Sequence, residues 1–192
     1  MTPESLLSIA AGLALAASAG FRVFVPLLVV SVAARTGWLA ISPTFEWIAT
    51  TPALTAFATA TVVEIGAYYV PFLDNLLDTV STPAAVVAGM IASASVLVDV
   101  PPWLQYSIAI AGAGSTAGVV AASTTMLRLK SSALTAGLGN AVLATFELFG
   151  AFGVALVAVL VPILALVMVA AIFAFVIRRL GRRSQRRRVP TA

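Results

Sequence analysis

Apolar residues run along this chain in stretches long enough to cross a membrane, separated by short polar or proline-containing segments. A spanning helix needs about 20 apolar residues to cross about 30 Å of hydrocarbon. The first stretch, residues 5–34, is too long for one straight span and is interrupted at "SAGFR", residues 18–22. We therefore predict two half-helices, with Pro26 in the first turn of the second, where a missing N–H group costs little.

The rest of the first half predicts two more helices. One covers residues 52–69 and the other residues 84–97. Trp38 and Trp47 lie in the connection before them, at positions that suit a membrane interface. Together with the broken segment, these helices make residues 1–98 a first membrane repeat.

The second half, residues 99–180, has the same order of elements. Residues 103–127 are apolar, rich in small side chains and predicted to be broken near their middle, at Gly112, Gly114 and Gly118. Two further helices are predicted at residues 141–160 and 163–177. This half is therefore a second membrane repeat.

The two halves match at two points. The triplets Ser18-Ala19-Gly20 and Thr116-Ala117-Gly118 stand 98 residues apart (116 − 18) in a chain of 192, and a Val-Pro step joins the later two helices of each half. With three crossings per half, the second half enters the membrane upside down. This predicts an all-α membrane protein of about six transmembrane segments in a 3+3 inverted repeat. If the broken segments re-enter instead of crossing, each half has two crossings and the repeat is parallel.

Composition identifies an integral membrane protein. Hydrophobic residues make up 61% of the chain and charged residues 9%, against about 45–50% and about 25% in soluble domains; the mean hydropathy is +1.08. The net charge of +4 belongs to the end of the chain, where seven arginines lie between Arg178 and Arg188. We expect residues 181–192 to be a disordered cytoplasmic tail that contacts anionic lipid headgroups of the cytoplasmic membrane.

The absence of cysteine and histidine narrows the chemistry. It excludes thiol nucleophiles, imidazole bases and the usual zinc and haem ligands. Neither a nucleophile elbow nor a paired acid motif is present, and no basic face with interleaved aromatic residues indicates nucleic-acid binding. We therefore expect no enzyme activity, no metal or other cofactor and no nucleic-acid partner.

Three segments resemble the membrane family DUF4126, a domain of unknown function. They are "AGLALAASAGFRVFVPLLVVSVAARTG", "VVEIGAYYVPFLDNLLDTVSTP" and the glycine-rich stretch leading into "STTMLRLKSSA". The resemblance implies a small polytopic bacterial membrane protein. Members of this family tend to carry a histidine, a lysine and an arginine on the helix after the second break, where this chain has Thr125, Arg128 and Ser132. Only the middle cation is kept.

Three ionisable residues fall inside predicted spans: Arg22, Glu64 and Glu147. A charge at the bilayer centre costs about 2.5–3.5 kcal/mol, so each is a candidate functional residue. Arg22, beside the free N–H groups of a half-helix start, would bind an anionic group. The alternatives are a structural ion pair between Arg22 and Glu64 or Glu147, or an Arg22 side chain that extends to a membrane interface. The two carboxyl groups would couple transport to protons or hold helices together by hydrogen bonds.

The leading hypothesis is a small transporter or channel-like permease for an unidentified solute, with an anion favoured by Arg22. Its pathway would run between the two broken helices, lined by the three charged residues together with Ser18, Gly20, Ser115, Thr116, Gly118 and Arg128. The glycines have a second interpretation, because small residues let membrane helices pack closely. The competing hypothesis is a non-transporting scaffold, a lipid-interacting protein or an accessory subunit. A homodimer is an open alternative under either hypothesis.

Overall fold

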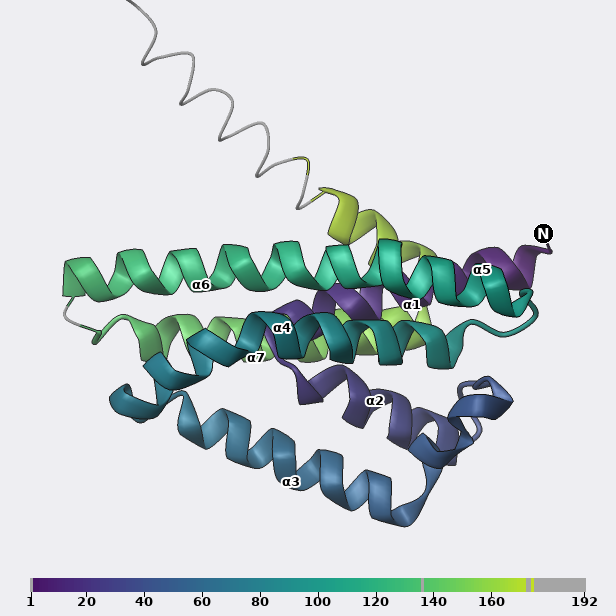
Figure 1. Ribbon diagram of the computed structural model, residues 1–192, viewed down its shortest axis with the longest axis horizontal. Helices are drawn as coiled ribbons and strands as arrows, with labels where there is room; N and C mark the ends of the chain where they lie inside the picture. The colour runs from purple at the N-terminus through teal and green to yellow at the C-terminus, as the bar shows by residue number, and fades with distance from the viewer. Residues whose placement is uncertain (1, 136, 172–173, 175–192) are drawn as a thin grey trace, which may run out of the picture.

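The computed structural model describes residues 2–135, 137–171 and 174, and all regular structure in these residues is helical (Figure 1). The predicted tail, residues 181–192 and the arginines from Arg178 to Arg188, lies outside the described residues. The helices in chain order are α1 (Pro3–Phe21), α2 (Phe24–Arg35), the 3-10 helix η1 (Pro43–Ala49), α3 (Thr51–Ala67), α4 (Pro71–Val96), α5 (Pro102–Ser107), the π-helical segment η2 (Ile108–Gly114), α6 (Ser115–Thr135) and α7 (Asn140–Leu160), followed by a short helix at Pro162–Ala171.

Four of these helices are long and apolar enough to cross a membrane. They are α1, the Thr79–Val96 part of α4, the continuous helix Pro102–Thr135 and α7. The pair η1 and α3, bent by 63°, makes a fifth candidate span. The chain is therefore a multi-pass membrane protein. The described residues contain four to five candidate spans, whereas the sequence predicted about six.

The first two helices form a hairpin, because the chain turns back where α1 ends and α2 begins (Figure 1). Ser5, near the start of α1, donates a hydrogen bond from its hydroxyl to the Asp99 carbonyl at 3.2 Å. The Ser42 N–H group, just after α2, donates to the Ser95 carbonyl at 2.8 Å. The beginning of α1 and the end of α2 therefore lie at the same end of the molecule.

The break in the hairpin has a local cause. The last bond of α1 runs from the Arg22 N–H to the Ser18 carbonyl at 3.0 Å, and Arg22 itself is extended. A continued helix would need an N–H group at residue 26 to bond the Arg22 carbonyl, and Pro26 has none. As the sequence predicted, the first segment is broken and Pro26 lies in the first turn of α2.

The glycine-rich segment of the second half does not break, which corrects the prediction for residues 112–118. Residues 102–135 form one continuous helix in which η2 widens the turns without interrupting them. The hydroxyls of Ser115 and Thr116 donate to the Gly112 carbonyl at 3.0 and 2.8 Å. No proline removes a backbone donor here, so the glycines alone leave the helix intact.

The two halves therefore differ, and the 3+3 inverted repeat is not confirmed. The first half opens with a hairpin, whereas the second opens with a helix that runs the length of the molecule (Figure 1). The individual helices predicted at residues 52–69 and 141–160 are confirmed as α3 and α7. The helix predicted at 84–97 begins earlier, at Pro71, and contains Pro83; membrane helices tolerate an internal proline where neighbours satisfy the freed group.

Helix α1 is the centre of the bundle and packs against α4, α6 and α7. Its contacts rely on small residues: a Cβ atom on Gly20 would lie 2.5 Å from Val120 Cβ and 2.7 Å from the Ala117 carbonyl oxygen. The core is accordingly rich in alanine. Helix α3 is different, because it packs on α2 and η1 and scarcely touches α4. This leaves a space beside the break.

Candidate functional site

A cluster of charged side chains is buried where α1 ends. Its members come from four different helices or their ends and are almost inaccessible, with exposed fractions of 1% for Arg22, 2% for Arg128, 6% for Glu64, 6% for Tyr68 and 8% for Glu147. The four charges, two positive and two negative, sum to zero. We call these five residues the ion cluster.

Glu147 of α7 is the partner of both arginines. Its carboxylate accepts from Arg128 Nε at 3.2 Å and makes a second contact with Arg128 Nη2, so this pair is bidentate. Arg22 Nη2 lies 3.9 Å from Glu147 Oε2 and donates to the Ala144 carbonyl, one turn earlier on α7, at 2.7 Å. The predicted structural pair of Arg22 with Glu147 is thus present, but Glu147 binds Arg128 more strongly, through two contacts.

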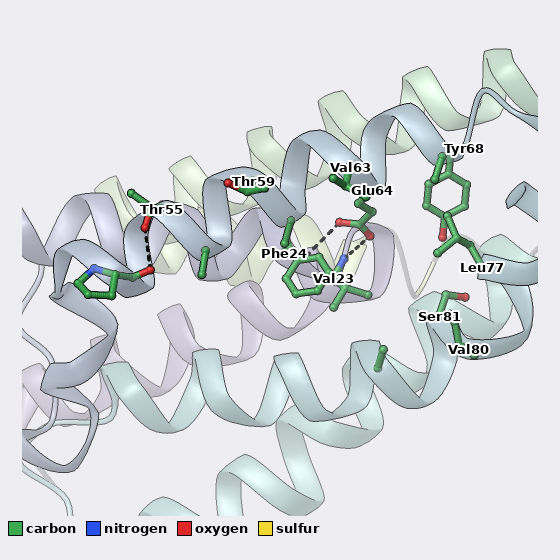
Figure 2. A pocket seen from close by; sticks show the side chains of 15 residues that line it. Val23, Phe24, Thr55, Thr59, Val63, Glu64, Tyr68, Leu77, Val80 and Ser81 are labelled. Atoms are coloured by element: carbon green, nitrogen blue, oxygen red, sulfur yellow. Dashed lines mark hydrogen bonds between the residues drawn. The ribbon is translucent and has the colours of Figure 1, made fainter.

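Glu64 of α3 caps the start of α2. Its carboxylate oxygens accept from the Val23 N–H at 2.8 Å and from the Phe24 N–H at 3.2 Å (Figure 2). These N–H groups are free because the helix is broken before them, and the positive end of the helix dipole favours an anion there. The sequence predicted an anion-binding position beside Arg22; in the structure the protein's own carboxylate occupies it.

Tyr68 holds the two guanidinium groups together. The guanidinium carbons of Arg22 and Arg128 lie 3.8 and 4.1 Å from the centre of its ring. Cation–π contacts of this kind gain strength when they are desolvated. Two like charges are therefore kept in the interior by one aromatic ring as well as by the carboxylates.

Arg22 retains donors without an acceptor. Its Nε and Nη1 atoms are buried and have no hydrogen-bond partner among the residues that the structure describes, although the residue is only 1% exposed. An unsatisfied buried donor costs about 1–3 kcal/mol, and more when it is charged. The carboxylates of Glu147 and Glu64 thus have hydrogen-bond donors, whereas the Arg22 guanidinium lacks acceptors for two of its nitrogen atoms.

Two cavities meet at Glu64 and Tyr68. The lateral cavity has a volume of about 790 Å³ and lies between α3 and α4, with mostly apolar walls (Figure 2). The inner chamber, of about 10 Å³, has room for about one water molecule. Val23, Ser81, Glu64 and Tyr68 line both, so these residues form the wall between an open apolar cavity and a closed polar one.

Five of the nine site residues predicted from the sequence are found at this place. Arg22, Glu64, Glu147 and Arg128 are in contact or share Tyr68, and Gly20 lines the inner chamber. Their proposed roles in a pathway stay predictions.

The other four are not part of the ion cluster, although the Ser18 carbonyl accepts the backbone N–H of Arg22 at 3.0 Å. Ser18 is fully buried and donates to the Ala151 carbonyl at 2.8 Å. Ser115 and Thr116 bond back to their own helix, and a Cβ atom on Gly118 would lie 3.1 Å from a Val86 methyl group. Arg128 is twelve residues or about 18 Å along the helix from Thr116, so Ser115, Thr116 and Gly118 lie at a distance from the ion cluster. The pathway roles predicted for these residues and for Ser18 stay predictions.

Sequence reasoning missed Tyr68, Thr124, Thr125 and Ser81, which line the inner chamber. Tyr68 had a usable signal, because it stands four residues after Glu64 and residues four apart share a helix face. Thr125 also had a signal, because it stands where members of the resembled family tend to carry a histidine. Thr124 and Ser81 had none, since hydroxyl residues are frequent throughout this chain.

The arrangement can bind and release an anion at the start of α2. Backbone N–H groups at a helix start bind carboxylates and phosphates generally. Here Glu64 is such a carboxylate, carried on α3, which packs mainly on α2 and η1. Moving α3 would withdraw Glu64 and expose both the α2 start and Arg22.

Comparison with known proteins gives one result. The sequence model of the family described as a domain of unknown function (DUF4126) matches residues 9–182, nearly the whole chain. No curated protein and no solved structure matches this chain significantly. The family resemblance seen in the sequence is confirmed: the chain belongs to the DUF4126 family.

Proposed function

We propose that this protein is a permease of the cytoplasmic membrane for an anionic solute, with its C-terminus on the cytoplasmic side. The single observation that carries the proposal is the capped start of α2. A carboxylate from α3 sits on two free backbone N–H groups, next to an arginine with two unpartnered donors. Transporters bind anionic groups at such interruptions of membrane helices.

The charge balance supports exchange at this position. With Glu64 in place the four charges of the ion cluster sum to zero, and without it the cluster carries one excess positive charge. An uncompensated charge in a membrane interior is costly, so withdrawal of Glu64 favours entry of an anion. In this proposal the solute takes the place of Glu64 on the α2 start.

The walls of the two cavities support a route to that position. Glu64 and Tyr68 separate the lateral cavity from the inner chamber, and both stand near the end of α3. A movement of α3 away from α2 would open the wall. Because α3 scarcely touches α4, the contacts that such a movement must break are those with α2 and η1.

The test is anion flux through the purified protein in liposomes. We expect currents with at least one anion of a panel of chloride, phosphate, acetate and octanesulfonate, recorded on a solid-supported membrane. Arg22→Gln should abolish them because it removes the buried cation. Arg35→Gln is the matched control, since Arg35 is exposed and bonds the Ala49 carbonyl and the Thr51 hydroxyl.

Two results would overturn the proposal. One is wild-type flux equal to that of empty liposomes for every anion in the panel. The other is a folded Arg22→Gln variant with wild-type flux. Either result would favour the competing function, a scaffold or accessory subunit in which the ion cluster holds the bundle together.

A further inference from the structure

The lateral cavity raises the question of what occupies it. Its walls are apolar side chains of α3, α4 and the start of α2, with Glu64 and Tyr68 at one end. Thr55, one of its few hydroxyl groups, bonds back to the Thr51 and Pro52 carbonyls of its own helix and offers the cavity little polarity. Apolar walls that converge on a few polar groups are typical of binding sites for amphiphilic ligands.

The position of the cavity sets the side from which a ligand enters. It lies between α3 and the Thr79–Val96 span of α4, two candidate membrane-crossing segments. Val63 and Val80 on its walls are 62% and 49% exposed, so it opens sideways between the two helices. In a bilayer this opening faces hydrocarbon, and an apolar ligand body can enter without passing through water.

The polar end of the cavity sets the chemistry of the ligand's head. Glu64, a cavity-wall residue, shows that a carboxylate fits the Val23 and Phe24 N–H groups. Arg22, buried and with two unpartnered donors, stacks on Tyr68 at the same end. A ligand head with one negative charge would accept the two backbone hydrogen bonds that Glu64 now accepts. It would also give Arg22 a hydrogen-bond acceptor.

We infer that the lateral cavity and the start of α2 form one binding site for an amphiphilic monocarboxylate, with its hydrocarbon tail between α3 and α4 and its head in place of the Glu64 carboxylate. This inference rests on the proposed function and names its substrate class. The α3 wall from Glu64 to Pro52 rises about 18 Å, which gives the tail an apolar surface along most of the helix.

The test is equilibrium binding of radiolabelled octanoate to the full-length protein in nanodiscs, measured by scintillation proximity. Empty nanodiscs give the background from partition into lipid. Wild-type protein should bind octanoate saturably and should bind octanol, which has the same tail without the charge, more weakly. Arg22→Gln should reduce octanoate binding to the level of octanol.

A pair of phenylalanine substitutions on α3 tests the position of the tail. Ala60→Phe places a ring in the cavity, because Ala60 is one of its wall residues. The loss of contact with about two methylene groups should weaken octanoate binding about tenfold. Val62→Phe is the matched control: Val62 is 69% exposed and is not a wall residue, so binding should stay at the wild-type level.

Glu64→Gln gives a result that misfolding cannot imitate. It removes the competing charge from the α2 start, so octanoate should bind several-fold more tightly than to wild-type protein. Unchanged or weaker binding in this variant, or equal binding to the Ala60→Phe and Val62→Phe variants, would overturn the inference.

The outcomes also separate the inference from the proposed function. Flux of chloride, phosphate or acetate without saturable octanoate binding would overturn the inference and leave the permease proposal in place. Saturable octanoate binding with no anion flux would support the binding site and overturn the permease. Equal binding of octanol and octanoate would show a site for hydrocarbon only, such as a lipid chain, and would overturn the anionic head.

Discussion

Two glycine-containing segments, residues 18–22 and residues 112–118, look alike in the sequence and behave differently in the structure. The first ends its helix and reverses the chain, and the second spans the junction of the π-helical segment η2 and α6 within one long helix. Both contain small residues that allow close packing. Only the first is followed by a proline, Pro26, at the position whose N–H group would have bonded the Arg22 carbonyl in a continued helix. At this break the Glu64 carboxylate accepts hydrogen bonds from the N–H groups that the break leaves free.

The difference teaches what a break in a membrane helix requires. Free N–H groups in hydrocarbon cost several kcal/mol each unless they find an acceptor. Glycine lowers the resistance of the backbone to bending but supplies no acceptor. A stable break therefore needs a residue that removes a helical bond and another that satisfies the exposed donors. Pro26 and Glu64 play these roles in the first segment.

The largest effect is expected from removing the shared counter-ion of the broken region. Glu147→Gln leaves Arg128 and Arg22 without their common carboxylate in a nearly inaccessible site. Breaking a buried ion pair on one side costs about 3–5 kcal/mol. Denaturation of the purified protein would measure the loss. Glu46→Gln is the control on the partly exposed helix η1, and an equal stability of the two variants would contradict the account.

The next effect comes from moving the proline into the unbroken helix. Thr124 stands 98 residues after Pro26 (26 + 98 = 124), and Glu147, the carboxylate beside its helix, is already bonded to Arg128. Thr124→Pro should destabilise the protein by about 3 kcal/mol or more, because it removes a helical bond and clashes with the preceding turn. Thr124→Ala, which loses only the hydroxyl, serves as its control in the same unfolding measurement. A well-folded proline variant of wild-type stability would show that the second segment is as ready to break as the first.

A smaller effect distinguishes the glycines of the two segments. Gly20→Ala would bring a Cβ atom to 2.5 Å from Val120 Cβ, whereas Gly118→Ala would bring one to 3.1 Å from a Val86 methyl group. Overpacking costs about 1–3 kcal/mol, so thermal unfolding should rank Gly20→Ala below Gly118→Ala in stability. Gly150→Ala, with nothing within 4 Å of the added atom, should be neutral or slightly stabilising. The reverse ranking would refute close packing at Gly20.

The sequence was sufficient for the membrane class, for the first break and for the charged residues of the site. Hydropathy determines which stretches cross the membrane, and a charge within such a stretch needs a partner wherever it lies. Arg22, Glu64 and Glu147 could therefore be selected without knowing how the helices pack.

The sequence left open whether the first broken segment crosses or returns, and it did not predict the continuous second helix or Tyr68. Whether a broken helix crosses or returns depends on which helices it packs against, and the positions of Ser5, Ser42 and Asp99 at one end emerge only from the tertiary structure. The repeated triplets suggested two equal breaks because the similarity concerns only the small residues themselves. It does not show whether a hydrogen-bond acceptor lies near enough to receive the N–H groups that a break would free. An aromatic residue near a helix end also has an ordinary interfacial interpretation.

The most direct measurement is hydrogen exchange of the Val23 and Phe24 amides by NMR. If the start of α2 is an anion-binding position filled by Glu64, both amides are protected in the wild-type protein. In Glu64→Gln they should exchange about tenfold faster, since a charge-assisted hydrogen bond is replaced by a weaker one, and added octanoate should restore their protection. Equal exchange in the two proteins, without any response to octanoate, would contradict the account.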